Sequence, residues 1–368
     1  MIKNSEIQRY DIDWKGKYLI YTTDDTDIEQ FPNIKEYLEN FYKKLVERAE
    51  VRDKLYPWYR LQRPRRRELW EAPEKIVVPF RAPENRFAYD DQQFFNDGGD
   101  IRVVVPKPEC PVNVKYILAC LNSKVLNFFY KFIGRPKGEM LEYFVEPLAK
   151  LPVHRINFSQ EFEKKMHDNL VELVNKMILL KKHLKEIITD FDRYLTEPIM
   201  GYVNFKDYYK KLDVKDKEAL DKTSTGIIKR VKVEEQDSWL IFKVNYFVKR
   251  DKTKEEFTDV PVLKCRFEDV YFRKFLLYIF QNYKKRWGSG NLLHVILKTP
   301  IPCFDKNPDK NKQVIEKIMK EFLKTVEEKE RTEKEIEQTD KMIDSKVYEL
   351  YGLTSEEISI IEDYLRRK

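Results

Sequence analysis

The feature that most constrains the fold of this chain is a long apolar repeat between residues 166 and 191. Its members follow one another at alternate steps of four and three, which places them along one stripe of an α-helix: Met166, Leu170, Leu173, Met177, Leu180, Leu184, Ile187 and Phe191. A looser apolar stripe lies between Asp309 and Tyr351. We expect these two long helices to pair antiparallel in a coiled-coil-like element. The alternative is an ordinary helix that faces a core.

The two stripes divide the 368 residues into four segments. We expect a mixed α/β domain over residues 1–158, a long spacer helix over 159–198, a smaller α+β unit over 199–304, and a long helix with a terminal helix over 305–368. The fold class is therefore α+β. The order of unit, helix, unit, helix also indicates a weak internal duplication.

Local patterns predict the elements within these segments. Runs of β-branched and aromatic residues between turn residues predict strands, here over residues 17–21, 75–80, 101–106, 225–233, 239–248 and 260–265. Helical spacing predicts helices from residue 34 to 45, from 113 to 132 and from 270 to 285. Near the end, Gly352 is placed to stop the long helix, and Thr354 or Ser355 to cap the next one.

A basic and aromatic stretch runs from Trp58 to Arg67. Together with Arg52 and Lys54 just upstream it contains seven basic side chains, interleaved with Trp58 and Tyr59 and followed by Trp70. Guanidinium groups bind phosphates and guanine edges in a bidentate manner, and aromatic rings support them by stacking. The stretch therefore favours a nucleic-acid surface. A solvated basic turn is the alternative.

The charge, the cysteine content and the hydropathy of the sequence narrow the class of protein. Lys and Arg number 70 against 63 Asp and Glu, so the net charge of +7 does not by itself indicate a polyanionic partner. The four cysteines are scattered without a Cys-x-x-Cys, which is typical of small buried side chains in a reduced cytoplasm rather than of a zinc site. No apolar run is long enough to span a bilayer, so we expect a soluble, cytoplasmic protein.

Three motifs in the first segment and one near the end resemble the TaqI-like C-terminal specificity domain, the DNA target-recognition part of adenine-N6 methyltransferases and fused restriction-modification enzymes. They are Trp-x-x-Leu-x-Arg-Pro-Arg from Trp58, Pro-x-Lys-Ile-Val-x-Pro from Pro73, Phe-Ala-x-Asp from Phe87 and Val-Tyr-x-Leu-Tyr-Gly-Leu-Thr-x-x-Glu-Ile from Val347. The resemblance implies that residues 1–158 are such a domain and that residues 199–304 are a smaller recognition-like unit.

The resemblance also implies partners and site residues. We expect double-stranded DNA as the ligand and assign to it Arg60, Arg63, Arg65, Arg66, Arg67, Trp58, Lys75, Arg135 and Lys137. Phosphate contacts would position the domain and at least one arginine would read a base edge. The partner protein would be an adenine-methyltransferase catalytic domain or subunit, and no membrane is involved.

The chain lacks the chemistry of methyl transfer. Its sequence holds no Asn/Asp-Pro-Pro-Tyr/Phe tetrapeptide and no glycine-rich turn for S-adenosylmethionine. We expect that cofactor on the catalytic partner and no catalytic or metal site here, which leaves open whether the chain is an enzyme. Two other functions stay open. One is an assembly protein that uses its paired helices, and the other is a nuclease around Asp259, Lys264 and Glu268, whose spacing is poor.

Overall fold

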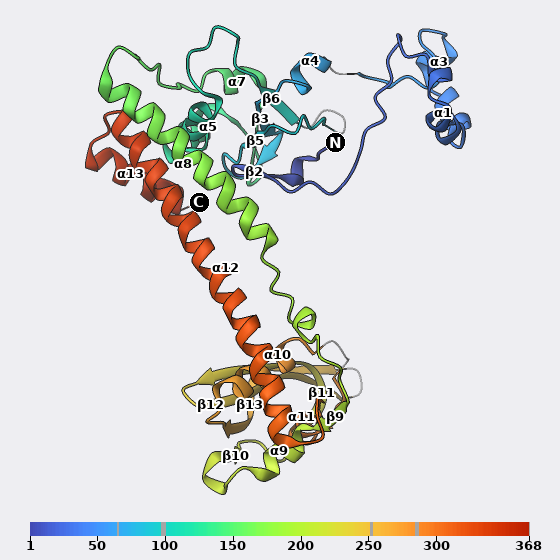
Figure 1. Cartoon of the computed structure of the whole chain (residues 1–368), viewed down its shortest axis with the longest axis vertical. Coiled ribbons are helices and arrows are strands. Elements are labelled where there is room, and N and C mark those ends of the chain that lie inside the picture. The colour runs from blue at the N-terminus through green and yellow to red at the C-terminus, as the bar shows by residue number, and fades with distance from the viewer. Residues whose placement is uncertain (65, 97–100, 251–252, 284–286, 368) are drawn as a thin grey trace. The chain divides into compact units, whose positions relative to one another are not determined.

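The computed structural model describes residues 1–64, 66–96, 101–250, 253–283 and 287–367 (Figure 1). They form two compact units, each with its own core. Unit 1 comprises residues 1–186 and 332–368, and unit 2 comprises residues 187–331. Both units contain helices and strands, which confirms the expected mixed class. The long helix α12 (Pro308–Leu350) contributes residues to each unit.

The strands of unit 1 form small antiparallel sheets, in the orders β5–β3–β6, β4–β8–β7 and β1–β2. Their bounds are β1 Ile7–Gln8, β2 Asp11–Ile12, β3 Lys75–Pro79, β4 Arg81–Ala82, β5 Ala88–Asp90, β6 Ile101–Val104, β7 Arg135–Lys137 and β8 Met140–Glu142. All five residues of β3 are buried. The strands expected over residues 75–80 and 101–106 are thereby confirmed.

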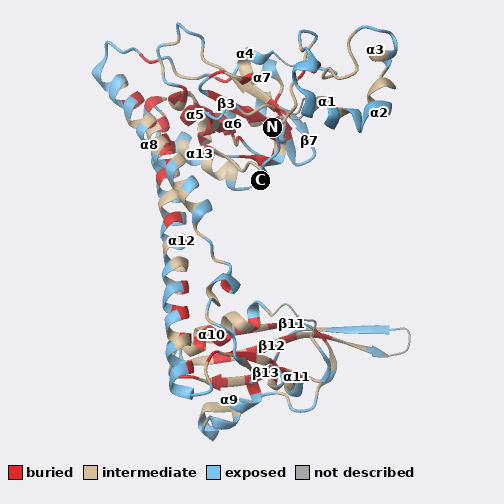
Figure 2. Cartoon of the chain, turned by 45° about the vertical axis from the view of Figure 1, so that its right-hand side comes forward, coloured by how far each residue is buried: buried red, intermediate tan, exposed pale blue. Residues whose placement is uncertain are grey.

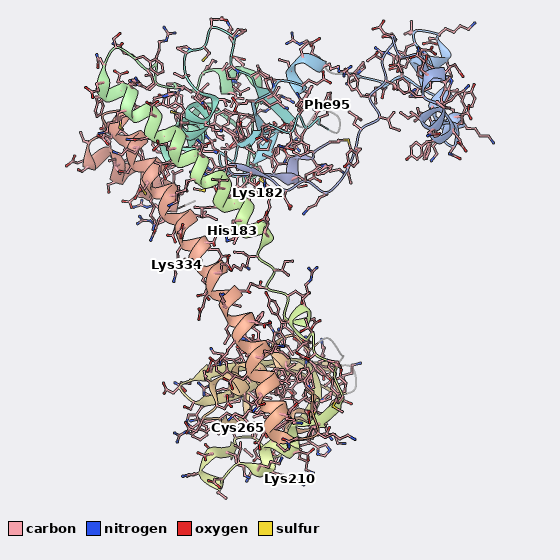
Figure 3. All side chains as sticks on the ribbon, viewed as in Figure 1. Phe95, Lys182, His183, Lys210, Cys265 and Lys334 are labelled. Carbon is pink, nitrogen blue, oxygen red and sulfur yellow. The ribbon has the colours of Figure 1, made fainter. Side chains whose placement is uncertain are left out.

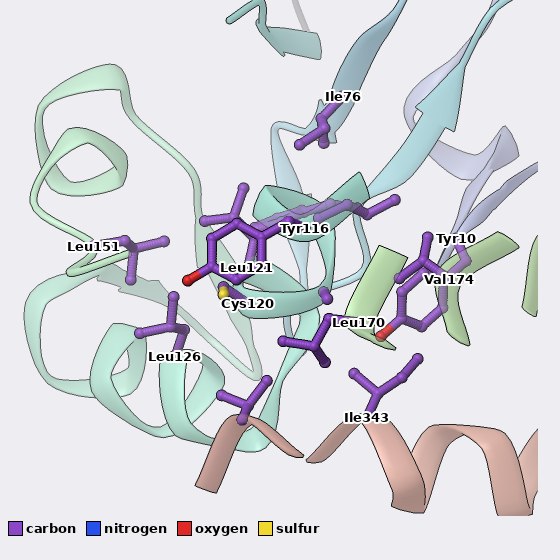
Figure 4. Close-up of a cluster of buried hydrophobic side chains, with 14 of the residues drawn as sticks. Tyr10, Ile76, Tyr116, Cys120, Leu121, Leu126, Leu151, Leu170, Val174 and Ile343 are labelled. Carbon is purple, nitrogen blue, oxygen red and sulfur yellow. The ribbon is translucent and has the colours of Figure 1, made fainter. Parts of the chain in front are cut away.

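The helices of unit 1 have these bounds: η1 Asn4–Glu6, η2 Ile28–Gln30, α1 Pro32–Glu39, α2 Tyr42–Val46, α3 Ala49–Arg52, α4 Arg67–Trp70, α5 Val114–Asn122, α6 Lys124–Ile133, α7 Val145–Ala149, α8 Glu161–Glu186 and α13 Ser355–Arg366. The single helix expected over residues 113–132 is in fact two. Ser123 separates them, because its hydroxyl donates to the Cys120 carbonyl at 2.7 Å and accepts from the Leu126 amide at 3.3 Å. Figure 4 shows the core beneath them, with Tyr116 and Leu170 among its members.

Helix α8 buries a stripe that differs from the expected heptad. Met166, Leu170, Val174 and Met177 are buried, whereas Leu173 lies on the flank of the stripe. These steps follow the 3.6-residue period of a straight helix. Within unit 1, α8 and the final part of α12 run in opposite directions and share one core (Figure 1). That the two form a coiled coil stays a prediction.

The end of the chain follows the expected stop and cap. Gly352 adopts a left-handed backbone with φ +65° just after α12, a conformation that glycine reaches without steric cost. The Thr354 hydroxyl accepts from the Glu357 amide at 3.3 Å, and the Glu357 carboxylate accepts from the Thr354 amide at 2.8 Å. This capping box starts α13.

The segment between β2 and α4 contains a helical lobe, residues 22–64, with α1, α2 and α3. The strand expected over residues 17–21 is wrong, because those residues have no regular secondary structure. Gly16 turns the chain there with φ +72°, and the Trp14 indole donates to the Lys17 carbonyl at 3.1 Å. This turn directs the segment away from strand pairing.

Unit 2 is built on a five-stranded antiparallel sheet in the order β10–β13–β12–β11–β14, with a separate β9–β15 pair. Its elements are η3 Phe191–Tyr194, β9 Gly201–Asn204, α9 Phe205–Lys211, η4 Val214–Asp216, β10 Lys217–Ala219, β11 Thr225–Gln236, β12 Trp239–Arg250, β13 Thr253–Arg266, α10 Val270–Gln281, β14 Ser289–Asn291, α11 Leu292–Leu297 and β15 Pro300–Cys303. The three predicted strands are confirmed as β11, β12 and β13. Figure 2 shows buried residues along them.

The length and hydropathy of a helix decide whether it can cross a membrane. In the part of the chain that the structure describes, no helix has both the length and the hydropathy needed to cross a membrane. The division of the chain into the four predicted segments stays a prediction.

Candidate nucleic-acid interface

Arg60 and Trp58, both expected on DNA, hold the helical lobe together. The Arg60 Nε lies 2.7 Å from Asp24 Oδ1, and the guanidinium lies 4.4 Å from the centre of the Tyr56 ring. Trp58 packs edge-on against Tyr42 with ring centroids 5.0 Å apart. Only 16% of the Arg60 side chain is exposed. The structure therefore gives Arg60 an intramolecular role, and its contact with DNA stays a prediction.

Arg63, Arg66 and Arg67 are exposed. Arg66 precedes the one-turn helix α4, which Arg67 begins. The Arg67 Nε lies 2.6 Å from a Glu71 carboxylate oxygen, and 63% of the side chain is exposed. Because exposed ion pairs of this kind contribute little, the guanidinium can exchange Glu71 for a phosphate at small cost. Arg65, the fifth arginine expected on DNA, lies outside the described residues.

The structure contradicts the expected DNA contact of Lys75. Its side chain is completely buried, and its Nζ lies 2.7 Å from Asp90 Oδ2 and donates to the Trp70 carbonyl at 2.6 Å. Lys75 and Asp90 are register partners on β3 and β5. A lysine held in this way cannot reach a phosphate, so its role is structural. By binding the Trp70 carbonyl, the last of α4, it fixes the helix that Arg67 begins.

Arg135 and Lys137 lie on the hairpin of β7 and β8, and both are exposed. The buried carboxylate of Glu142 holds the base of the hairpin. One of its oxygens lies 2.6 Å from Arg81 Nη2, and the other lies 3.8 Å from Arg135 Nε. This arrangement adds Arg81, half-exposed, to the basic residues around the hairpin. The sequence pattern does not single it out, although it begins β4, two residues after the end of the buried strand β3.

Helix α4 contributes to a groove with a volume of about 1070 Å³. Strand β6 and helices α5 and α7 supply apolar side chains to it, among them Val103, Ile117 and Leu148. Arg66 lines the groove together with Arg102 and Lys107. The sequence pattern missed these last two because they lie in and just after a strand that was expected to pack.

On its other side, α4 contributes to a smaller pocket of about 450 Å³, to which Arg67 belongs. Five aromatic side chains line it, and we call it the aromatic pocket: its residues are Met1, Trp14, Tyr18, Leu19, Tyr21, Arg67, Glu71, Gln92, Gln93, Phe94 and Phe95. Phe95 is labelled in Figure 3. Consecutive arginines, Arg66 and Arg67, thus line different clefts. The pocket was missed because residues 17–21 were interpreted as a strand.

Two further kinds of group could carry chemistry, namely cysteine thiols and clustered metal ligands. Burial raises the pKa of the thiols of Cys120 and Cys265 to about 12, so both stay protonated at neutral pH. All four cysteines are free. Among the described residues, no three His, Cys, Asp or Glu side chains are grouped so as to hold a metal ion. The surface offers guanidinium groups beside an apolar groove and an aromatic pocket, an arrangement suited to binding.

Comparison with known proteins identifies the class of domain. Residues 1–153 match the TaqI-like C-terminal specificity domain, which confirms the resemblance drawn from the motifs. The type II methyltransferases M.HindII and M.HincII of Haemophilus influenzae are each 30% identical to the chain over 165 residues, 43% of this chain and 32% of theirs. The chain thus spans about a third of the length of these two relatives.

Two further proteins are similar to the chain. The putative type II restriction enzyme and methyltransferase RM.MjaORFECS2P of Methanocaldococcus jannaschii is 27% identical over 173 residues, 44% of this chain and 13% of that protein. The crystal structure of a type I restriction-modification system S subunit from M. genitalium aligns with a TM-score of 0.42 at 11% identity. That alignment covers 75% of this chain and 82% of the subunit.

Proposed function

We propose that this chain is the DNA sequence-recognition module of a type II restriction-modification adenine-N6 methyltransferase. The observation that carries the proposal is that the part matched to the specificity domain exposes Arg63, Arg66 and Arg67, the last two of which line separate clefts. The guanidinium group of arginine forms bidentate hydrogen bonds with phosphates, which position a protein on DNA, and with guanine edges, through which a protein reads the sequence. Arg135 and Lys137 on the β7–β8 hairpin supply further exposed charge.

In this proposal a separate catalytic domain or subunit supplies S-adenosylmethionine and transfers the methyl group. Two features support this division of labour. The sequence contains no Pro-Pro pair, and therefore no Asn/Asp-Pro-Pro-Tyr/Phe loop to grip the target adenine. The two methyltransferase relatives are about three times as long as their matched part.

The module would act in the cytoplasm, where its thiols stay reduced. We expect the purified chain alone to transfer no methyl group to duplex DNA.

Salt-dependent binding tests the proposal. The affinity of the purified chain for a pool of random-sequence duplexes is measured by fluorescence anisotropy between 50 and 200 mM salt, a range over which phosphate contacts weaken steeply. Each phosphate contact contributes about 0.9 to the slope of log affinity against log salt. The triple variant Arg63→Ala, Arg66→Ala, Arg67→Ala should therefore lower the slope by roughly 2–3.

The control variant removes the same charge elsewhere on unit 1. Lys164, Lys165 and Lys182 are exposed on α8, and Lys182 is labelled in Figure 3. Their triple change to alanine should leave the slope nearly unchanged. If the chain binds no duplex even at the lowest salt, the recognition proposal is refuted and an assembly role for the long helices is favoured. If both triple variants reduce the slope equally, the exposed arginines are not the DNA surface.

A further inference from the structure

We propose that the aromatic pocket binds a nucleobase that has left the base stack of the bound DNA. The inference rests on the proposed DNA recognition and extends it, because it assigns an unstacked base to the pocket that Arg67 helps to line. The pocket volume of about 450 Å³ lies within the range of small-molecule sites, roughly 300–1,000 Å³, and admits one base.

The walls of the pocket are rings in edge and tilted contact. Trp14 meets Tyr18 at a centroid distance of 5.2 Å and Phe94 at 5.5 Å, and Tyr21 meets Phe95 at 5.3 Å. Proteins that bind unstacked bases use aromatic faces in this way, because every base has a π-face to stack. Tyr18 is 84% exposed, so the core gains little from its ring. An aromatic ring held out in water beside a pocket is suited to a ligand.

The local backbone positions Trp14, Tyr18 and Phe94 in the chain, and the Trp14 ring is held by a hydrogen bond. The turn at Gly16 brings Tyr18 back toward Trp14, and the Lys17 carbonyl accepts from both the Trp14 indole at 3.1 Å and the Met1 ammonium at 2.9 Å. At Phe94, whose ring contacts that of Trp14, the Asp90 carboxylate accepts from the backbone amide at 3.0 Å. The Lys75–Asp90 pair in the core thereby also positions a wall of this pocket. The pocket is preorganised, which reduces the entropic cost of binding.

Two adjacent glutamines give the pocket a polar edge. The Gln93 amide nitrogen donates to the Glu71 carbonyl at 2.8 Å, and the Gln92 amide nitrogen donates to Asp91 at 2.9 Å. A primary amide that uses one N–H in this way still offers a second N–H and a carbonyl oxygen. Gln93 also has a left-handed backbone with φ +55°, uncommon for this residue type and frequent at binding sites. Paired donors and acceptors match the hydrogen-bonding edge of a base.

The Arg67 guanidinium places a charge at the rim of the pocket. The Arg67 guanidinium lies 5.9 Å from the centre of the Tyr21 ring, so a cation already faces this wall. Its Nε lies 2.6 Å from the carboxylate of Glu71, which lines the same pocket. A nucleotide brings a phosphate next to its base, and this phosphate can replace Glu71 as the partner of Arg67 at small cost. The rim charge therefore favours a nucleotide.

The test compares two duplexes of one sequence, one with a single unpaired 2-aminopurine and one in which that base is paired. The purified chain should bind the bulged duplex about tenfold more tightly, the factor that corresponds to the lower part of the range for stacking one base on an aromatic side chain. Binding should also quench the 2-aminopurine fluorescence, as stacking does. Tyr18→Ala should abolish the preference and the quenching, and Tyr18→Phe should retain both.

The matched control is Tyr37→Ala, since Tyr37 is an exposed aromatic residue, 54% accessible, on α1 of the helical lobe. It should leave the preference unchanged. Equal affinity of the wild-type chain for the two duplexes would overturn the pocket assignment while leaving DNA recognition standing. Loss of affinity for both duplexes alike in Tyr18→Ala would also overturn it. No binding to either duplex would refute the proposed function and, with it, this inference.

Discussion

Replacing Lys75 by methionine tests whether the buried pair, rather than a DNA contact, is the role of this lysine. The change keeps the length and apolar stem of the side chain but leaves the Asp90 carboxylate buried without its cation, since both side chains are 0% exposed. Removing one partner of a buried ion pair costs about 3–5 kcal/mol. Unit 1 falls in the size class in which each kcal/mol lowers Tm by roughly 2–4 °C, so its Tm should fall by roughly 6–20 °C.

A second substitution separates charge from packing. The Gln92 and Phe94 amides donate to different oxygens of the Asp90 carboxylate, at 2.8 and 3.0 Å. In Lys75→Met with Asp90→Asn, the amide oxygen can still accept from one of these two amides, and no charge is left buried. The double variant should therefore recover a large part of the lost stability.

The assay is thermal unfolding followed by circular dichroism. The control is Lys137→Met on the exposed hairpin, which should change the stability by no more than about 0.5 kcal/mol. The reasoning would be refuted if Lys75→Met unfolded like the wild type and lowered the salt slope of DNA binding by about 0.9, the value for one lost phosphate contact.

Two further predictions concern the contacts of α12 and α13. Burial raises the pKa of Asp344 to about 6 from an ordinary value of 3.8. The contribution of Asp344 to stability therefore falls by about 3 kcal/mol as the pH rises from 3.8 to about 6. The Asp344→Asn variant cannot ionise at this position. Urea unfolding below pH 3.8 and above pH 6 should therefore show that the stability of the variant relative to the wild type rises by a similar amount. A stability difference that does not change with pH would contradict this prediction. Thr354→Ala should cost about 1 kcal/mol by removing the capping box, whereas Thr354→Ser should retain it; equal losses in the two would count against the cap.

Local patterns predicted those parts of the fold that local forces determine. The run of apolar residues in β3, the turn at Gly352 and the cap at Thr354 each depend on a few neighbouring residues, and each is found where expected. The break between α5 and α6 was missed, although Ser123 is a good cap, because the apolar spacing continues across it. The apolar spacing, which predicts one continuous helix, therefore hides the helix-capping signal at Ser123.

The candidate site could be predicted only in part, because its geometry depends on residues far apart in sequence. The basic stretch was evident, but the burial of Lys75 follows from a register that places Asp90, fifteen positions later, opposite it. The aromatic pocket combines Trp14 and Tyr18 with Phe94 and Arg67, which only the fold brings together. Two of the family-like motifs, Pro-x-Lys-Ile-Val-x-Pro and Phe-Ala-x-Asp, each contain one member of the buried pair. These two motifs therefore serve the fold, and the contact of the exposed arginines with DNA stays a prediction.

Selection from a pool of random duplexes tests the central claim of sequence-specific DNA recognition most directly. The purified chain is incubated with the pool near physiological salt, the bound fraction is recovered and amplified over several rounds, and the final pool is sequenced. The account predicts one enriched sequence, with single changes at Arg63, Arg66 or Arg67 either relaxing one position of it or weakening all sequences alike. Binding that enriches no sequence would contradict the account.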